Sequence, residues 1–438
     1  EVAHNGTEYE IKVNGVVQPG GTQTTALLDK LDADGMFHVG INIQAAVKNG
    51  TAAITILKYG TSEQMYKVDE TYTMRLFFHT NLDSLKQMDA EGTNVNGVVL
   101  SNYNFRKAMS LAINRSDFVA ATAGYKPAYS LINSLYFYDV YNDPASIYRN
   151  TDQAKQVLCD FYGVDTSKFA NLDDAVASIT GYDPEQAKVF FKQAYDEGIK
   201  AGYINDADND GKCDQVVKIE YALSSDSDFM TKTIDYLNEK AAEVTAGTPF
   251  EGKINFYKSG PYGNEWSDKI KQGLSDTVLG GWSGSVLDPF GLTDLYTNPA
   301  KQYDAAWYDA TTVELTINVP VNGENKDVTL TLKQWSDVLN GTATTVDGVE
   351  YNYGSGQCDI EVRLDILAAC EGKILESYNY LPMLQDGSMA LLSQQVFYVV
   401  EEYNPIMGRG GIAYMKYNYT ESEWAEYVNS QPDGILTY

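Results

Sequence analysis

Helix and strand patterns alternate along residues 183–281, and this alternation constrains the fold more than any other feature of the chain. Asp183, Pro184 and Glu185 form a helix start, with an N-cap residue, a proline in the first turn and an acidic neighbour. We expect this helix to end at Gly198. The segments that follow predict a strand at 217–223, a helix at 229–244, a strand at 253–257, a helix at 265–274 and a strand at 277–281. A β-α-β-α-β order predicts a largely parallel sheet with right-handed crossovers, so the fold class is α/β.

The first 80 residues follow a different pattern. Short alternating runs at 9–13, 53–57 and 72–77 are separated by glycine and asparagine, which predicts mixed or antiparallel sheet. Because 438 residues exceed the usual size of one domain, we expect two.

A binding motif follows the last strand of the alternating region. Residues 280–289 read Gly-Gly-Trp-Ser-Gly-Ser-Val-Leu-Asp-Pro, directly after an apolar run. Ligands of open α/β sheets bind beyond the carboxyl ends of strands, and glycines let a ligand approach the backbone closely. We therefore expect a ligand-binding surface here, without a reaction centre. The alternative is a tryptophan that fills a corner of the core beside a glycine turn. The candidate ligand-binding residues are Gly281, Trp282, Ser283, Ser285 and Asp288.

Three stretches of the chain together resemble one protein family. The Gly-Trp pair followed by Asp-Pro is the first, and residues 102–115 (Asn-Tyr-Asn-Phe-Arg-Lys-Ala-Met-Ser-Leu-Ala-Ile-Asn-Arg) are similar to a family helix of pattern N-x-x-V-R-x-A-x-x-x-A-I-D-R. Residues 374–384, with Ile-Leu-Glu and Leu-Pro-Met-Leu, are similar to a segment near the family's C-terminus. The family is that of the oligopeptide- and dipeptide-binding proteins of ABC transporters, extracellular solute-binding family 5, and the resemblance covers roughly residues 70–430.

The resemblance implies a two-lobed, type II periplasmic-binding-protein-like architecture, in which the lobes close on a solute by hinge motion. Residues 1–118 would form a partial first lobe, because much of the family's N-terminal region is missing. Residues 119–398 would form a second α/β lobe with the Gly-Trp motif, and 399–438 would return to the first lobe. The implied protein is a bacterial, monomeric, non-enzymatic importer component that delivers peptides or other small solutes to a membrane permease. It would be extracellular, lipid-anchored at the cell surface or periplasmic, with its anchor segment outside this chain.

The sequence differs from the family's pattern at one position that affects which solute can bind. Peptide binders of the family place a carboxylate three residues after the Gly-Trp pair, where it pairs with the peptide's α-amine. Ser285 stands at that position here, and Asp288 is the nearest carboxylate. A serine hydroxyl offers only a neutral hydrogen bond, so a sugar or another neutral solute stays open beside a peptide.

Charge and composition exclude several classes of protein. The formal net charge of −28 repels nucleic acids and anionic membranes. The sequence has no run of 18 apolar residues that would span a bilayer. The three histidines have no supporting pattern of cysteine or serine around them, which argues against a histidine-dependent triad or a zinc site. We assign no catalytic residue and no required cofactor. Two alternatives stay open. One is a secreted hydrolase or carbohydrate-active enzyme on a mixed α/β scaffold, which would need a pair of carboxyl groups with raised pKa, and the other is a tyrosine-rich interaction module.

An acidic loop is the candidate metal site. Asp206, Asp208, Asp210, Lys212 and Asp214 stand at positions 1, 3, 5, 7 and 9 of a calcium-loop pattern, with a glycine at position 6. Position 12 is Val217 rather than the bidentate glutamate, so we expect weak, structural Ca²⁺ binding with a dissociation constant of about 10⁻⁴–10⁻³ M. The alternative is a solvated turn. The four cysteines are expected to be free thiols.

Overall fold

The computed structural model describes residues 2–4, 9–13, 16–17, 65–93, 96–122, 124–281, 284–299, 310–391, 393–398, 415–432 and 436. The chain divides into two compact units. Unit 1 comprises residues 1–70, 123–125 and 386–438, and unit 2 comprises residues 71–122 and 126–385. The predicted lobe boundaries at 118 and 398 are a different division of the chain, and they stay a prediction.

Unit 1 contains small antiparallel sheets. Strands β1 (Val2–His4), β2 (Tyr9–Val13) and β3 (Val16–Val17) pair in sequence order, and β14 (Val396–Tyr398) pairs with β15 (Met415–Tyr417). Helix α15 (Glu421–Ser430) begins at a capping box formed by Thr420 and Glu423. The predicted strand at 9–13 is present as β2, whereas the expected strand at 53–57 lies outside the described residues.

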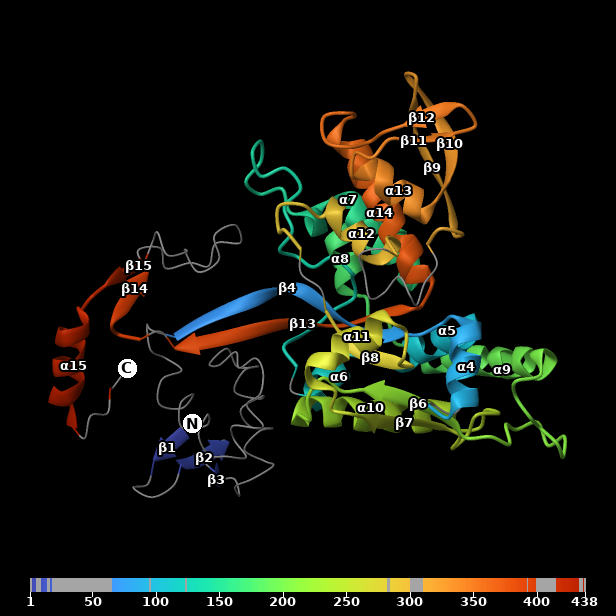
Figure 1. Cartoon of the computed structure of the whole chain (residues 1–438), viewed down its shortest axis with the longest axis horizontal. Coiled ribbons are helices and arrows are strands. Elements are labelled where there is room, and N and C mark those ends of the chain that lie inside the picture. Colours follow the sequence, from blue (N-terminus) through green and yellow to red (C-terminus); the bar gives the residue numbers. More distant parts are fainter. Residues whose placement is uncertain are drawn as a thin grey trace. The chain divides into compact units, whose positions relative to one another are not determined.

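A six-stranded mixed sheet organises unit 2 (Figure 1). Its order is β5-β13-β4-β8-β6-β7, and strands β4 and β13 run side by side. Strand β6 pairs in parallel with β7 and β8, as the alternating pattern predicts, while β4 pairs with β8 in antiparallel orientation. The strands are β4 (Met65–Phe78), β5 (Lys126–Pro127), β6 (Val217–Ala222), β7 (Ile254–Ser259), β8 (Thr277–Gly280) and β13 (Tyr380–Leu391).

The predicted helices of the alternating region are all present, with one difference at Gly198. Helix α9 (Pro184–Ala201) starts where Asp183 accepts a hydrogen bond from the Gln186 N–H, but it continues through Gly198 and ends at Gly202 (φ +81°). A Cβ on Gly198 would lie 2.4 Å from the Ile204 side chain, so this glycine allows a close approach and does not end the helix. The other two helices are α10 (Asp228–Thr245) and α11 (Trp266–Lys271).

Unit 2 has two hydrophobic cores. The first lies among β6, β7 and the helices α4 (Leu82–Glu91), α5 (Tyr103–Ala112), α6 (Arg115–Thr122), α9 and α10. The second lies among the helices α7 (Asp152–Tyr162), α12 (Thr293–Thr297), α13 (Leu332–Leu339) and α14 (Ile360–Glu376) and the hairpin β9–β10 (Glu314–Val321 and Glu324–Thr331). In Figure 1 these two sets of elements lie on opposite sides of β4 and β13. Unit 2 also contains α8 (Leu172–Ala177) and the hairpin β11–β12 (Thr344–Val346 and Val349–Tyr351).

The buried carboxylate of Glu371 binds the chain segment 131–149, which leads into the second core. Glu371, on α14, accepts hydrogen bonds from the backbone N–H groups of Leu131 and Ile132 at 3.0 and 3.1 Å. Its other oxygen accepts from the Tyr148 hydroxyl at 3.0 Å and from the Arg149 guanidinium. The Glu371 side chain is 1% exposed, so all of these contacts are shielded from water.

No helix in the described part of the chain is long and apolar enough to span a membrane. Cys159, Cys213, Cys358 and Cys370 are free thiols, as expected.

Candidate functional site

The candidate ligand-binding turn begins at the carboxyl end of β8. This strand lies between β4 and β6, and its last residue, Gly280, pairs with Arg75 of β4. A Cβ on Gly281 would lie 2.6 Å from the Tyr72 ring and 3.2 Å from the Thr73 carbonyl oxygen. Gly281 is therefore required by its packing against β4, independently of any ligand. Trp282 and Ser283, which we expected to contact a ligand, lie outside the described residues.

Hydrogen bonds fix the turn that carries the remaining candidates. The Gly284 N–H donates to the Tyr136 hydroxyl at 3.0 Å, and the Phe137 N–H donates to the Val286 carbonyl at 2.7 Å. Within the turn, the Asp288 N–H donates to the Ser285 carbonyl at 2.9 Å. Ser285 and Asp288 are both exposed, so the structure places these two candidates on one solvent-facing turn.

Asp288 already has partners within the protein. Its Oδ1 accepts a hydrogen bond from the Gly291 N–H at 3.1 Å, at the start of the next helical turn. Its charge also acts on Arg363, whose guanidinium lies 3.7 Å from the centre of the Phe290 ring. Burial lowers the pKa of Arg363, and the nearby Asp288 carboxylate opposes that shift. A ligand's amine would therefore share Asp288 with a resident cation.

Two arginines of the 102–115 motif are structural. Arg106 donates to the carbonyl oxygens of Leu100 at 2.7 Å and of Ser377 at 3.0 Å, which joins the start of α5 to the end of α14. Arg115 donates to carbonyl oxygens that include that of Pro382 in β13, at 3.2 Å. The family resemblance singled out this helix, but sequence reasoning did not identify the role of either arginine.

One carboxyl group in the sheet has a strongly perturbed pKa. Asp276, which precedes β8, is 0% exposed, and its Oδ2 accepts from the Glu220 N–H at 2.8 Å. Burial raises the pKa of Asp276 well above its usual value. The neighbouring Glu220 side chain is 3% exposed and pairs with Lys269 at 3.1 Å. These carboxyl groups have no access to a substrate, so they do not supply the pair that a hydrolase would need.

The structure brings three of the expected calcium ligands together. One oxygen each of Asp206, Asp208 and Asp210 lie within 4.8 Å of one another. The Tyr195 hydroxyl donates to Asp206 Oδ2 at 2.6 Å, and this hydrogen bond lowers the pKa of Asp206. Asp214 does not belong to this group, and its Oδ2 accepts from the Ala207 N–H at 2.7 Å.

The comparisons with known proteins identify the family. Residues 16–304 match the family described as bacterial extracellular solute-binding proteins, family 5, middle. Since this match covers more than half of the chain, the chain belongs to that family. The assignment confirms the predicted family and fold class, and the family is one of substrate-binding transport proteins rather than of enzymes. The match includes the 102–115 helix and the 280–289 turn. A search of curated proteins found no match.

Several solved structures resemble the chain. The substrate-binding domain of an oligopeptide ABC transporter from Bacillus anthracis str. Ames is 13% identical, over 85% of this chain and 53% of that chain, with a TM-score of 0.49. Listeria monocytogenes OppA bound to peptide is 16% identical, over 84% and 52%, with a TM-score of 0.46. The pheromone receptor PrgZ is 14% identical, over 90% and 56%, with a TM-score of 0.49. The chain thus spans about half the length of these proteins.

Proposed function

We propose that this chain is the solute-binding component of an ABC importer and that it binds a peptide or a related small solute at the turn after β8. The observation that carries this proposal is membership of the extracellular solute-binding family over residues 16–304. The exposed Ser285 and Asp288, at the end of a strand, support the location of the site. We propose further that the protein acts as an extracellular monomer, either anchored by lipid at the cell surface or periplasmic, and delivers its solute to a membrane permease.

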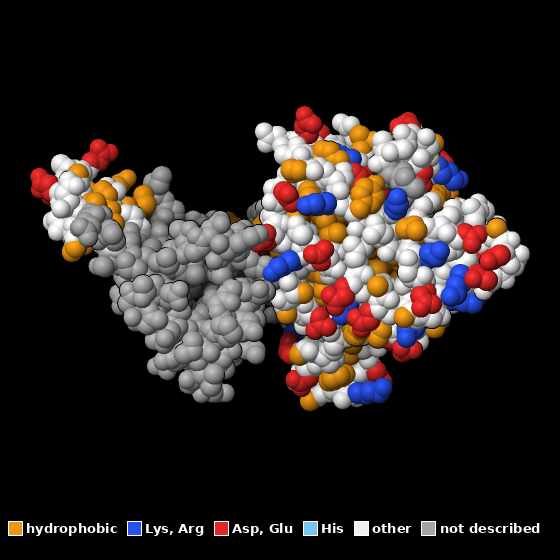
Figure 2. All heavy atoms as spheres, turned by 90° about the horizontal axis from the view of Figure 1, so that it is seen from below, with side chains coloured by type: hydrophobic (Ala, Val, Ile, Leu, Met, Phe, Trp, Pro, Cys, Tyr) orange, Lys and Arg blue, Asp and Glu red, His pale blue; other side chains and the backbone are white. Residues whose placement is uncertain are grey.

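Surface charge supports a partner other than a nucleic acid. Figure 2 shows acidic and basic side chains interspersed over the described residues on one face, without a continuous basic patch. With a net charge of −28, the chain repels polyanions, whereas it can attract solutes that carry an amine.

The first test concerns the ligand's amine. If Asp288 anchors it, Asp288→Asn should weaken binding of free-amine di- to pentapeptides about tenfold, because a charge-assisted hydrogen bond becomes a neutral one. N-acetylated versions of the same peptides should bind the native protein and the variant equally. Calorimetric titration of both peptide series measures the two differences.

A gain-of-function variant serves as the control. Ser285→Asp places a carboxylate where peptide binders of the family carry one, so it should strengthen binding of the free-amine series only. Equal affinity of the native protein for the amine and acetylated peptides would contradict an amine anchor and would favour a neutral solute such as a sugar.

We also propose that the acidic loop binds Ca²⁺ weakly, with a structural role. The convergence of Asp206, Asp208 and Asp210 supports it, and the Lys212 carbonyl and Asp214 would complete the set of oxygen ligands. At ten times the dissociation constant, Ca²⁺ should stabilise the fold by about 1.4 kcal/mol and raise the melting temperature by about 1–3 °C. Thermal melts with Ca²⁺, with Mg²⁺ and with chelator measure this shift. Asp208→Ala should abolish the shift. Identical melting curves of the native protein with calcium and with chelator would contradict the proposed site.

A further inference from the structure

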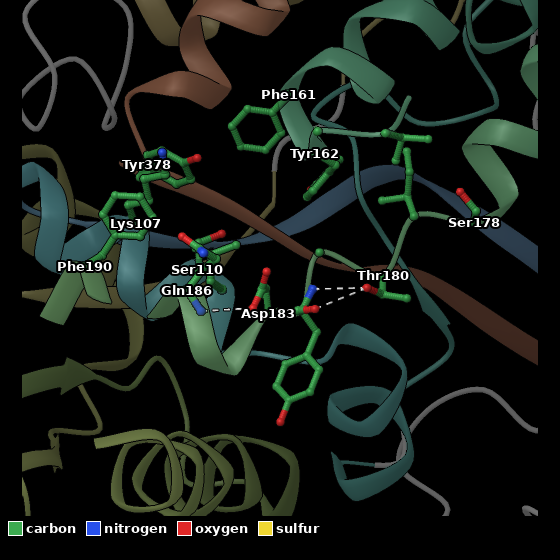
Figure 3. Close-up of a pocket in the computed structure, with 16 residues that line it drawn as sticks. Lys107, Ser110, Phe161, Tyr162, Ser178, Thr180, Asp183, Gln186, Phe190 and Tyr378 are labelled. Atoms are coloured by element: carbon green, nitrogen blue, oxygen red, sulfur yellow. Dashed lines mark hydrogen bonds between the residues drawn. The ribbon is translucent and has the colours of Figure 1, made fainter. Parts of the chain in front are cut away.

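Unit 2 contains a pocket whose lining includes no residue of the turn after β8 (Figure 3). It has a volume of about 380 Å³, which is within the range of pockets that hold small molecules. Helices α5 and α9, the C-terminal end of α7 and the loop between α8 and α9 form its walls, together with Tyr378. The pocket thus lies between elements of the first and the second hydrophobic core.

An ammonium group stands at the aromatic end of this pocket. Lys107 Nζ lies 4.3 Å from the centre of the Phe190 ring and 5.7 Å from that of Tyr378, both of which line the pocket. Figure 3 shows Tyr378 and Phe190 beside Lys107, and the Phe161 ring lies 5.4 Å from that of Tyr378. None of the ion pairs in the described part of the chain involves Lys107. Ring faces position a cation without neutralising its charge, so the positive charge remains available.

A second positive charge lies beneath the pocket. Arg115 is 0% exposed and donates to the carbonyl oxygens of Ser110, Ile113 and Gly181 at 2.6, 2.7 and 2.9 Å, and to that of Pro382 at 3.2 Å. Its remaining bond, at 3.0 Å, goes to the Ser110 hydroxyl. Every one of these acceptors is a neutral oxygen, so none of them cancels the charge of the guanidinium. Ser110 and Gly181 also line the pocket, which places the buried charge directly behind the wall.

The acidic residue that lines the pocket, Asp183, is engaged in capping a helix. Asp183 is the N-cap of α9, where its Oδ1 accepts from the Gln186 N–H at 3.0 Å. Its negative charge therefore faces the positive end of the α9 dipole. The pocket thus combines two cations that no carboxylate neutralises and one acid used in helix capping, and the rings of Phe161, Phe190 and Tyr378 offer apolar surface.

From this arrangement we propose that the pocket binds a small organic carboxylate with an aromatic or apolar body. The carboxylate would pair with Lys107 Nζ, with support from the potential of Arg115, and the body would pack against Phe161, Phe190 and Tyr378. This site is separate from the turn after β8, because the two share no residue. Failure of either proposal therefore leaves the other intact.

A matched pair of probes tests the charge requirement. N-acetyl-phenylalanine carries a carboxylate, whereas its amide has the same body without the charge. The acid should bind with a dissociation constant of about 1 mM, and the amide about tenfold more weakly. Ligand-observed NMR titration of both compounds measures the ratio.

Two lysine variants test whether Lys107 is responsible for the preference for the acid over the amide. Lys107→Met keeps a long apolar side chain against the rings and removes the charge, so it should reduce the affinity for the acid to that for the amide. Lys192→Met, on the exposed surface of the neighbouring α9, removes the same formal charge and should leave the ratio unchanged. Absence of binding at about 10 mM, equal binding of acid and amide, or an unchanged ratio in Lys107→Met would each overturn the proposal.

Discussion

Glu371→Gln should destabilise the protein by about 3–5 kcal/mol, because it removes one partner of a buried ion pair and leaves the other charge without compensation. The substitution keeps the size of the side chain, and its remaining oxygen can still accept from the Leu131 and Ile132 N–H groups. The lost partner is the carboxylate that accepts from Tyr148 and Arg149, whose side chain is 11% exposed. Chemical denaturation followed by circular dichroism measures the loss.

The same helix supplies a control. Glu376 is exposed and lies 3.6 Å from Lys373, so Glu376→Gln makes the same chemical change at a pair that contributes at most about 1 kcal/mol. Adding Arg149→Met to Glu371→Gln should restore part of the stability, because it removes the uncompensated cation. If Glu371→Gln costs no more than Glu376→Gln, the buried network is not a determinant of stability.

The sequence predicted the elements whose signals are local. Hydrophobic periodicity and helix caps predicted α9, α10, β6, β7 and β8, together with the parallel pairing of β6 with its neighbours. The antiparallel pairing of β4 with β8 joins Arg75 to Gly280, about 200 residues apart, and no local pattern carries such a pairing. The prediction that the helix ends at Gly198 was wrong. A glycine that allows close packing cannot be distinguished in the sequence from a glycine that ends a helix.

The candidate site was predicted only in part, because contacts between segments that are distant in the sequence leave no local pattern. The order of strand and glycine turn placed Ser285 and Asp288 beyond β8, where they lie. The sequence could not reveal that Gly281 packs on Tyr72, or that Asp288 acts on Arg363, because both contacts join distant segments. The Lys107 pocket was missed because its walls come from α5, α7, α9 and the chain after α14.

Acidification should weaken the fold through His79, the residue that follows β4. His79 is 1% exposed, and burial lowers its pKa from 6.5 to about 4. The unfolded chain therefore binds a proton between pH 6.5 and 4 that the folded protein does not, so stability is complete above pH 6.5 and falls as the pH decreases through this window. A shift of this size corresponds to a loss of about 3 kcal/mol.

The neighbouring Asp276 changes the stability of the fold in the opposite direction as the pH falls, so a variant of Asp276 serves as the control. The raised pKa of its carboxyl group means that its contribution is complete below the unfolded value of about 3.9 and is lost as the pH rises. Comparing denaturation midpoints at pH 6.5 and pH 4 therefore requires two variants. His79→Gln should remove the histidine's loss of about 3 kcal/mol, whereas Asp276→Asn should lose more stability on acidification than the native protein, because that variant keeps the buried imidazole and lacks the carboxyl group whose protonation opposes the loss. A His79→Gln protein that loses as much stability on acidification as the native protein would show that carboxylates elsewhere, and not this histidine, govern the acid response.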